Sequence, residues 1–235
     1  MRIVTWNCYS GTATDRFAEL TPLCPDIVVL QECSGSRELN SDNYLWFGDN
    51  SKKGLAVFSQ NGFTVSLGPH AQSVPHSVFP LTVSGPIGFN LLAVWSLCDP
   101  TYARAINCGL DAYACFIKSG PTVIAGDFNT HPLLDARQRG CNHSTLVERL
   151  GSEFGLVSAY HAFRTPGSPE EATLYYKWKQ NAPFHIDYCF IPRDWLGSLR
   201  EVSIGSYEDW QGKSDHRPLL VDLAEVRTTQ LTEHA

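Results

Sequence analysis

Short runs of apolar residues alternate with polar turns along the whole chain, and most of these runs have the length of a strand. Several are continuous, which is typical of strands buried on both faces, and others alternate between apolar and polar positions. The pattern predicts strands at Met1–Asn7, Asp26–Leu30, Leu55–Phe58, Phe89–Trp95, Thr122–Ala125, His185–Ile191 and Pro218–Leu223.

Helical periodicity is clear in two places. Thr12 or Thr14 can cap a short helix over Asp15–Leu20, which Pro22 and Pro25 then end. Between Tyr102 and Ile117 apolar residues recur at helical spacing, so we expect this stretch to cover a face of the sheet. The alternation of strands and helices indicates an α/β fold.

The 235 residues contain no internal repeat and no linker-like segment, so we predict a single catalytic domain over residues 1–227. Residues 228–235 are expected to form a flexible tail. No signal peptide or membrane span is visible, and the eight cysteines show no Cys-x-x-Cys spacing. We therefore expect a monomeric cytoplasmic protein with no membrane insertion, whose thiols are reduced.

The net charge of −6 argues against a protein that coats nucleic acid through bulk electrostatics. Against this acidic background, polar side chains follow the most apolar segments. Asn7 follows Trp6, Glu32 follows the run that ends at Leu30, and Asp127 with Asn129 follows another apolar run. Carboxylates beside a core cost free energy unless they are paired or bind a metal. Strand ends at one edge of a sheet can form a site from distant segments.

Asp187 is different because it lies inside an alternating strand, on the face that His185 and Cys189 share. A buried carboxylate in that position needs a dedicated partner. A histidine is the natural candidate, since the carboxylate fixes the tautomer and supports positive charge on the ring.

Five short motifs follow one another along the chain. The motifs are Thr5-Trp6-Asn7, Leu30-Gln31-Glu32, Gly126-Asp127-Phe128-Asn129, His185-Ile186-Asp187-Tyr188 and Ser214-Asp215-His216-Arg217-Pro218. Any one of them alone would be weak evidence, but the ordered set is specific. The set resembles the endonuclease/exonuclease/phosphatase superfamily, which shares its fold with deoxyribonuclease I and exonuclease III. The resemblance implies a four-layer sandwich of two mainly antiparallel sheets flanked by helices.

The resemblance also implies a metal site. Glu32 would be the main ligand, and Asn7 and Asp215 would help it. Magnesium takes few carboxylates and is completed by waters and substrate phosphate, which fits this set, and manganese could substitute for it.

The remaining motif residues would carry the catalytic steps. By resemblance, Asp127 orients or deprotonates the attacking water, and Asn129 positions that water and the phosphate. His216, paired with Asp187, would contact the phosphate and stabilise the charge of the transition state.

One position departs from the family pattern. The strand that ends near Leu97 carries Trp95-Ser96 where members commonly present a catalytic histidine or tyrosine. Tyr102, Arg104 or His131 are the candidates to replace that phosphate contact, and Trp95 and Arg104 remain candidates to bind substrate.

The segment Tyr175-Tyr176-Lys177-Trp178-Lys179 combines aromatic faces with cations just before His185. Such a mixture can stack bases and neutralise phosphates, so Tyr176, Lys177, Trp178 and Lys179 are predicted to bind substrate. The alternative is an amphipathic strand or hairpin with solvated lysines. By resemblance, this region borders the substrate cleft.

Three functions remain open. The leading hypothesis is a metal-dependent phosphodiesterase, in particular an endonuclease, acting on nucleic acid. The second keeps the chemistry but places a small phosphorylated metabolite or lipid headgroup in the site. A noncatalytic binding module ranks last, because all the principal catalytic residue types are present.

Overall fold

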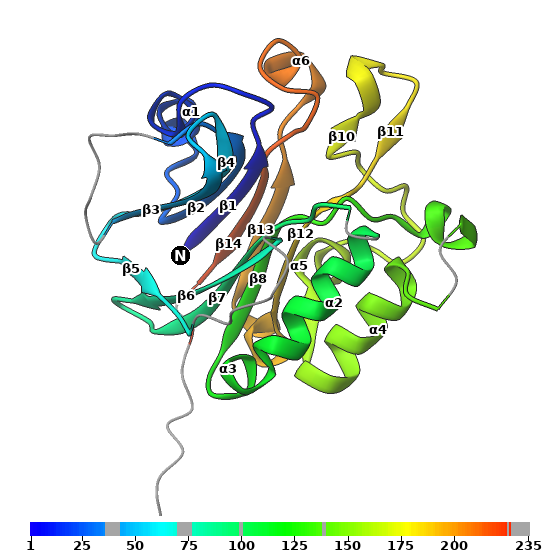
Figure 1. Ribbon diagram of the computed structural model, residues 1–235. Coiled ribbons are helices and arrows are strands. Elements are labelled where there is room, and N and C mark those ends of the chain that lie inside the picture. The colour runs from blue at the N-terminus through cyan, green and yellow to red at the C-terminus, as the bar shows by residue number, and fades with distance from the viewer. Residues whose placement is uncertain (36–42, 70–76, 99–100, 138–139, 225, 227–235) are drawn as a thin grey trace, which may run out of the picture.

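Two six-stranded sheets lie face to face in the computed structural model, with helices on their outer faces (Figure 1). The structure describes residues 1–35, 43–69, 77–98, 101–137, 140–224 and 226. The predicted tail at 228–235 lies outside these residues. Within them, no helix is long and apolar enough to cross a membrane.

At the centre of the first sheet lie strands formed by the continuous apolar runs of the first quarter of the chain. Only its β1–β2 pair is parallel, and the neighbouring pairs are antiparallel. In spatial order its strands are β13 (Leu199–Ile204), β14 (Leu219–Leu223), β1 (Arg2–Asn7), β2 (Ile27–Cys33), β4 (Lys53–Ser59) and β3 (Tyr44–Asn50).

The second sheet repeats this plan, with one parallel pair, β7–β8, at its centre. Its order is β5 (Thr64–Leu67), β6 (Val78–Ser84), β7 (Phe89–Trp95), β8 (Thr122–Asp127), β12 (Asp187–Pro192) and β9 (Leu156–Ser158). A separate hairpin of β10 (Leu174–Tyr175) and β11 (Pro183–Phe184) stands beside the sheets.

Helices complete the layers. The first sheet carries α1, and the second carries α2, α3 and α4, while α5 contacts both β12 and β13. The helices are α1 (Ala13–Leu20), α2 (Tyr102–Ala112), α3 (Ala114–Lys118), α4 (His143–Phe154), α5 (Ala159–Phe163) and α6 (Tyr207–Trp210). Short 3₁₀ turns occupy Thr21–Leu23, Pro132–Arg137, Tyr176–Trp178 and Arg193–Ser198. The predicted four-layer α/β sandwich is confirmed.

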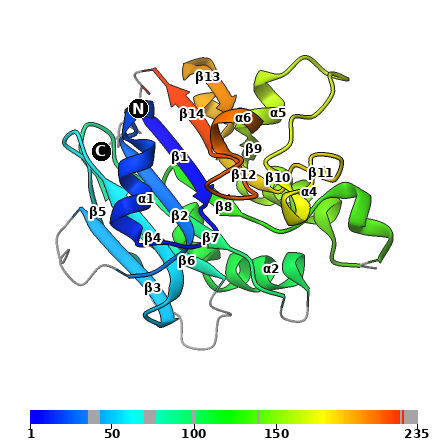
Figure 2. The same ribbon diagram turned by 90° about the horizontal axis from the view of Figure 1, so that it is seen from above.

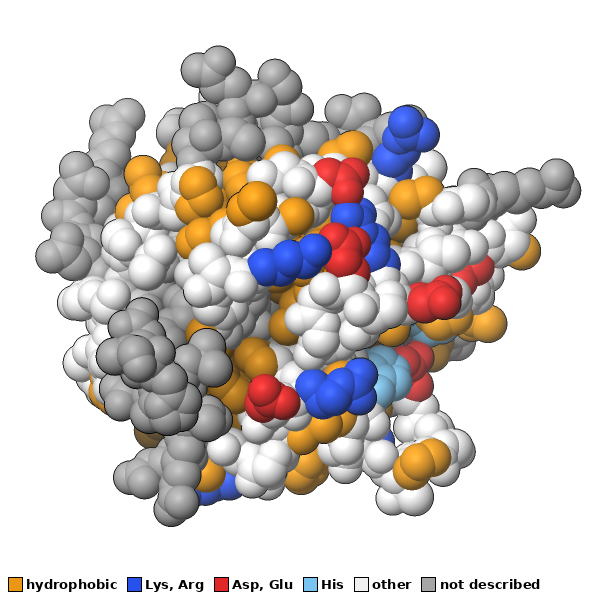
Figure 3. Space-filling view, turned by 90° about the horizontal axis from the view of Figure 1, so that it is seen from below, with side chains coloured by type: hydrophobic (Ala, Val, Ile, Leu, Met, Phe, Trp, Pro, Cys, Tyr) orange, Lys and Arg blue, Asp and Glu red, His pale blue; other side chains and the backbone are white. Residues whose placement is uncertain are grey.

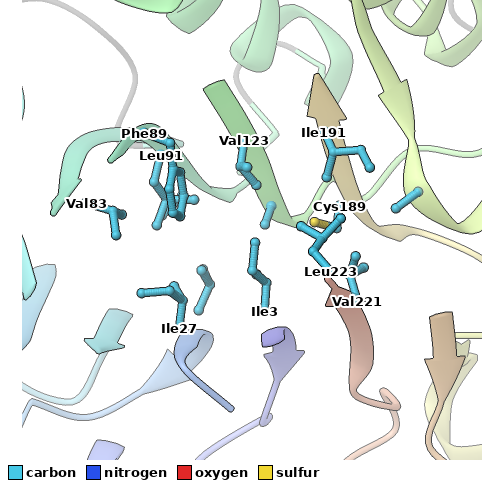
Figure 4. Packing of buried hydrophobic residues seen from close by; sticks show 14 of the residues in the cluster. Ile3, Ile27, Val83, Phe89, Leu91, Val123, Cys189, Ile191, Val221 and Leu223 are labelled. Carbon is cyan, nitrogen blue, oxygen red and sulfur yellow. The ribbon is translucent and has the colours of Figure 1, made fainter. Parts of the chain in front are cut away.

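The largest core lies between the two sheets. Ile3 and Ile27 of the first sheet point toward Leu91 and Val123 of the second (Figure 4). All four are at most 1% exposed. Burial of one such side chain contributes about 1.5–3 kcal/mol, so this layer fixes how the strand ends of both sheets face each other.

The predicted strands are all present, but some boundaries differ. β2 continues through Gln31 and Glu32 to Cys33, so Glu32 lies within the strand at a register shift. His185 precedes β12. The stretch predicted to be helical over Tyr102–Ile117 is helical and covers the second sheet, but Tyr113, at φ −106° and ψ 14°, divides it into α2 and α3.

The cap of α1 resolves an alternative that the sequence left open. The Thr12 hydroxyl accepts the backbone N–H of Asp15 at 3.1 Å, so Thr12 is the N-cap. α4 was not predicted, although its ends carry recognisable signals. Asn142 forms a capping box with Thr145, and Gly155 ends the helix in the left-handed region at φ +66°.

Candidate active site

The two parallel strand pairs bring four strand ends to one edge of the molecule. Figure 2 looks onto this edge and shows the ends of β1 and β8 side by side. The Asn7 amide donates a hydrogen bond to Asp127 Oδ2 at 2.9 Å and so joins the two sheets. The polar residues at the ends of β1 and β8 therefore meet.

Backbone geometry explains the Gly-Asp-Phe-Asn motif. Gly126 has φ +149°, and a Cβ at this position would collide with the Val94 carbonyl oxygen of the neighbouring strand. Asn129 has φ +51°, which lets its N–H and its amide both turn back to Asp127. Only glycine fits the first position, and asparagine tolerates the second better than most residues.

Asp127 is fully buried at the centre of the site. It accepts hydrogen bonds from the Asn7 amide, from the backbone N–H of Asn129 at 2.9 Å and from the Asn129 amide at 3.0 Å. Burial and then the charge of Asp187 raise the pKa of Asp127 to about 7, although these hydrogen bonds oppose the rise. The carboxyl group can therefore take up or release a proton near neutral pH.

Asp187 has the histidine partner that the sequence predicted. Its Oδ2 lies 2.8 Å from His216 Nδ1, and both side chains are buried. Burial by itself lowers the pKa of His216, but the charge of Asp187 and the hydrogen bond to it raise that pKa to about 9. At neutral pH the ring is therefore protonated and donates to Asp187.

Neighbouring hydroxyl groups hold this pair in place. Thr173 Oγ1 accepts the backbone N–H of Asp187 at 3.0 Å, and Ser214 Oγ accepts that of His216 at 3.0 Å. Ser214 then donates to the Asn7 carbonyl at 2.7 Å. Asp187 Oδ1 is buried without a hydrogen-bond partner among the described residues.

Glu32 and Asp215 form an acidic pair next to this centre. Burial raises the pKa of Asp215; the charge of His216 opposes that rise, and the charge of Glu32 adds to it. Glu32 also binds Lys53 Nζ at 2.6 Å, a cation that the sequence gave no reason to select. Two carboxylates that repel each other are a donor set that a hard divalent cation would stabilise.

A second group of possible ligands lies deeper. One atom each from Asp127, Asp187 and His216 lies within 4.8 Å of the other two. Magnesium prefers oxygen donors, however, and the His216 ring is already bound to Asp187. The carboxylate oxygens of Glu32 and Asp215 are therefore the better candidate donors for a hard divalent cation.

Ser96 and Tyr102 occupy the region where the family pattern was missing. Trp95 packs against the core between the sheets. The Ser96 hydroxyl donates to the Tyr102 carbonyl at 2.9 Å, and the Ser96 backbone carbonyl accepts from the Asn129 amide at 3.1 Å. Burial, then Cys98 and the charge of Asp127, raise the pKa of the Tyr102 phenol. The phenol thus lies close to the site.

The two other candidates for this position are less suitable. Arg104 is exposed on α2. His131 is bound to Glu170 at 3.0 Å and to the backbone N–H of Leu133 at 3.2 Å. Tyr102 is therefore the residue that the structure favours. His185 is also turned elsewhere, since its Nδ1 lies 2.8 Å from the Glu171 carbonyl and its ring packs 4.3 Å from Tyr160.

The segment Tyr176–Lys179 lies at the tip of the β10–β11 hairpin. Tyr175 donates its backbone N–H to the Asp215 carbonyl at 2.8 Å, which places the hairpin beside the acidic pair. Tyr176, Lys177, Trp178 and Lys179 are all exposed, so they are accessible to a substrate. The segment is therefore the tip of a hairpin and not an amphipathic strand.

The opposite end of the molecule differs in character. Figure 3 shows that face, where basic and acidic side chains lie next to each other. Such mixed charge does not favour phosphate binding there.

Comparisons with known proteins identify a family and a fold. The model of the Endonuclease/Exonuclease/phosphatase family matches residues 4–216. No match was found among the curated proteins.

Solved structures share the fold. A 3′-5′ exonuclease (NExo) from Neisseria meningitidis has 19% identity and a TM-score of 0.69, over 95% of this chain and 100% of that chain. An AP endonuclease from Archaeoglobus fulgidus has 16% identity and a TM-score of 0.70, over 96% and 100%. The endonuclease domain of TRAS1, a telomere-specific non-LTR retrotransposon, has 17% identity and a TM-score of 0.66, over 95% and 97%.

Proposed function

The chain belongs to the endonuclease/exonuclease/phosphatase family and is a phosphoester hydrolase of the nuclease or phosphatase type, and we propose that it is a metal-dependent phosphodiesterase acting on nucleic acid. The observation that carries the proposal is that one buried centre contains both a group that can accept a proton and a group that is already protonated. Asp127, with a pKa of about 7, can accept a proton, and His216, with a pKa of about 9, holds one. Hydrolysis of a phosphodiester needs both.

In the proposed mechanism Asp127 accepts a proton from the attacking water as the water oxygen bonds to phosphorus. The P–O bond to the leaving group then breaks, and the leaving oxygen takes a proton from solvent. The amide N–H groups of Asn129 bind Asp127 and Ser96, so its side-chain oxygen positions that water by accepting a hydrogen bond from it. Protonated His216 faces the negative charge that grows on the phosphate, and Asp187 keeps the ring charged and oriented. In phosphoryl transfer, positioning and charge stabilisation of this kind supply most of the catalysis.

Glu32 and Asp215 would hold the cation, with help from the Asn7 amide oxygen. When bound, the cation would neutralise charge on the non-bridging phosphate oxygens. The phenol of Tyr102 would donate a hydrogen bond to the phosphate, in the place where Trp95-Ser96 departs from the family pattern.

The choice of nucleic acid rests on the rim of the site. Tyr176 is 50% and Trp178 is 40% exposed, and two lysines flank Trp178. Aromatic faces and cations together suit a strand of bases and phosphates. One structural neighbour is described as a 3′ phosphatase from Neisseria bound to a product DNA hairpin.

A substrate panel tests the proposal. Plasmid, abasic duplex, single-stranded DNA, RNA and small phosphomonoesters and phosphodiesters are incubated with Mg²⁺ or Mn²⁺. We expect cleavage of at least one nucleic acid, and we expect Asp127→Asn and His216→Gln to lose nearly all of it while remaining folded. Turnover of a small ester alone would reject the nucleic-acid substrate. Undiminished turnover in both variants would reject the mechanism.

A further inference from the structure

Two exposed aromatic rings meet at the mouth of the candidate site. Tyr9 is 49% exposed and Trp178 is 40% exposed, yet their rings contact each other edge to face, with centroids 5.4 Å apart and planes at 77°. The two residues lie far apart in the sequence. The contact therefore bridges the segment after β1 and the tip of the β10–β11 hairpin.

Both rings are held by unfavourable backbone geometry. Tyr9 has φ +65°, Lys177 has φ +54° and Trp178 has φ +62°. Bulky residues rarely adopt this left-handed region, and such conformations persist where the surrounding structure enforces them, often at functional sites. Burial does not account for them, because these side chains face solvent.

Hydrogen bonds enforce this geometry and tie it to the site. The Asn7 amide oxygen accepts the backbone N–H of Tyr9 at 3.0 Å, and the other end of the same amide binds Asp127. In the hairpin, the Tyr176 N–H donates to the Ala182 carbonyl at 3.0 Å, and the Lys179 N–H donates to the Tyr176 carbonyl at 3.2 Å. The pair is thus part of the rigid frame of the site.

We propose that Tyr9 and Trp178 form a stacking platform for the base of an unpaired nucleotide next to the phosphate that is cleaved. The inference rests on the proposed function and adds a substrate class to it, namely single-stranded or frayed nucleic acid. Tyr9 was not among the residues predicted from the sequence. In this proposal Tyr9 is a residue that binds the base.

The position of the platform fits one nucleotide. Tyr9 is two residues from Asn7, and two residues of chain span at most about 7 Å. A phosphate at Asp127 and His216 would therefore place an adjacent base within reach of the rings. Lys177 and Lys179, on either side of Trp178, would face the next phosphates of the strand.

The geometry favours an unpaired base for a simple reason. Inside a duplex, both faces of a base are covered by its stacked neighbours, so a protein ring can reach a face only at a strand end or after unpairing. Stacking on aromatic side chains also tolerates every base, because each has a π face. The platform thus selects for strandedness and not for sequence.

The test compares two single-stranded oligonucleotides of equal length in Mg²⁺. One carries bases throughout, and the other has base-free tetrahydrofuran units at every internal position. For the wild-type protein we expect kcat/KM about 5- to 100-fold higher on the base-bearing strand, from the usual strength of base stacking. Trp178→Leu and Tyr9→Leu should bring this ratio close to one.

Two further variants separate stacking from folding. Trp178→Phe keeps an aromatic face and should retain most of the ratio. Phe163→Leu changes another ring that is 40% exposed, at the end of α5, and should leave the ratio as in the wild type. A ratio near one in the wild type, or an unchanged ratio in both leucine variants at Tyr9 and Trp178, overturns the platform.

Binding measurements give an answer that does not depend on hydrolysis. Fluorescence anisotropy in excess chelator measures Kd for labelled forms of the same two strands and for a blunt duplex. The platform is supported, even if no substrate is cleaved, when the wild type binds the base-free strand and the duplex more weakly than the base-bearing strand and Trp178→Leu removes this difference in Kd. Equal affinity for all three overturns it, whatever the outcome for the proposed function.

Discussion

Replacing Asp187 by asparagine would remove one negative charge beside His216 and keep the size of the side chain. The carboxylate lies 2.8 Å from the ring nitrogen, and both groups are buried, so solvent screens the pair little. The pKa of His216 stands at about 9 against an ordinary value of 6.5. This difference corresponds to about 3 kcal/mol in favour of the protonated ring.

The expected effect follows from the protonated fraction. At pH 7.5 a histidine with a pKa of about 9 is about 97% protonated, whereas one at or below 6.5 is at most about 10% protonated. Burial without Asp187 lowers the pKa, so Asp187→Asn should reduce kcat at least about tenfold at this pH. Because protonation returns as the pH falls, the gap between the two proteins should narrow toward pH 6.

The assay is kcat on the best substrate of the panel, measured from pH 6 to 8, with thermal unfolding to confirm the fold. Asp222→Asn is the matched control, since Asp222 pairs with Arg2 at 3.3 Å at the other end of the first sheet. It should leave kcat unchanged. Wild-type kcat in Asp187→Asn at pH 7.5 would refute the role of the pair. A deficit of constant size from pH 6 to 8 would refute its dependence on ring protonation.

Three other changes probe the metal, the phosphate contact and the buried histidine. Excess chelator should abolish hydrolysis, and added Mg²⁺ or Mn²⁺ should restore it. Glu32→Gln should raise the metal concentration needed for half-maximal rate about tenfold or more. Hydrolysis that resists the chelator would contradict the metal site. Tyr102→Phe should lower kcat about tenfold without changing Tm, because losing one hydrogen bond to a charged group usually has an effect of this size. An unchanged kcat would exclude the phenol as the phosphate contact. Burial lowers the pKa of His185 to about 4, so the unfolded chain gains a proton between pH 6.5 and 4 that the folded protein does not, and stability is lost as pH falls. Between pH 7 and pH 4 the free energy of unfolding, measured with denaturant, should therefore fall about 3 kcal/mol less in His185→Gln than in the wild type. Parallel plots of this free energy against pH for the two proteins would contradict the prediction.

The strands were predictable because their cause is local. Ile27 to Leu30 and Val123 to Ala125 are continuous apolar runs, and such runs are stable only where both faces of a strand are covered. By contrast β10 and β11 have two residues each, which is too short for a periodic pattern. The break at Tyr113 was missed because apolar spacing continues through it into α3.

The site was predictable in residue type for a related reason. Glu32, Asp127 and Asp187 stand next to strongly apolar segments, where an unpaired carboxylate would be unstable, so the sequence alone points to partners or to a metal. The partnership of Asp187 with a histidine also followed from its chemistry. Which atoms meet did not, since the Asn7–Asp127 hydrogen bond depends on how the two sheets pack.

The sequence by itself therefore determined the strands, the chemical character of the site and the ordered motifs of the family. Only the tertiary structure decided that Tyr102 lies beside Ser96, where the sequence departs from the family pattern, that Lys53 binds Glu32, and that the rings of Tyr9 and Trp178 are in contact. The physical reason is that hydrophobic periodicity and the cost of burying charge act over a few residues. Contacts between distant segments depend on the register and packing of both sheets, which no short segment encodes.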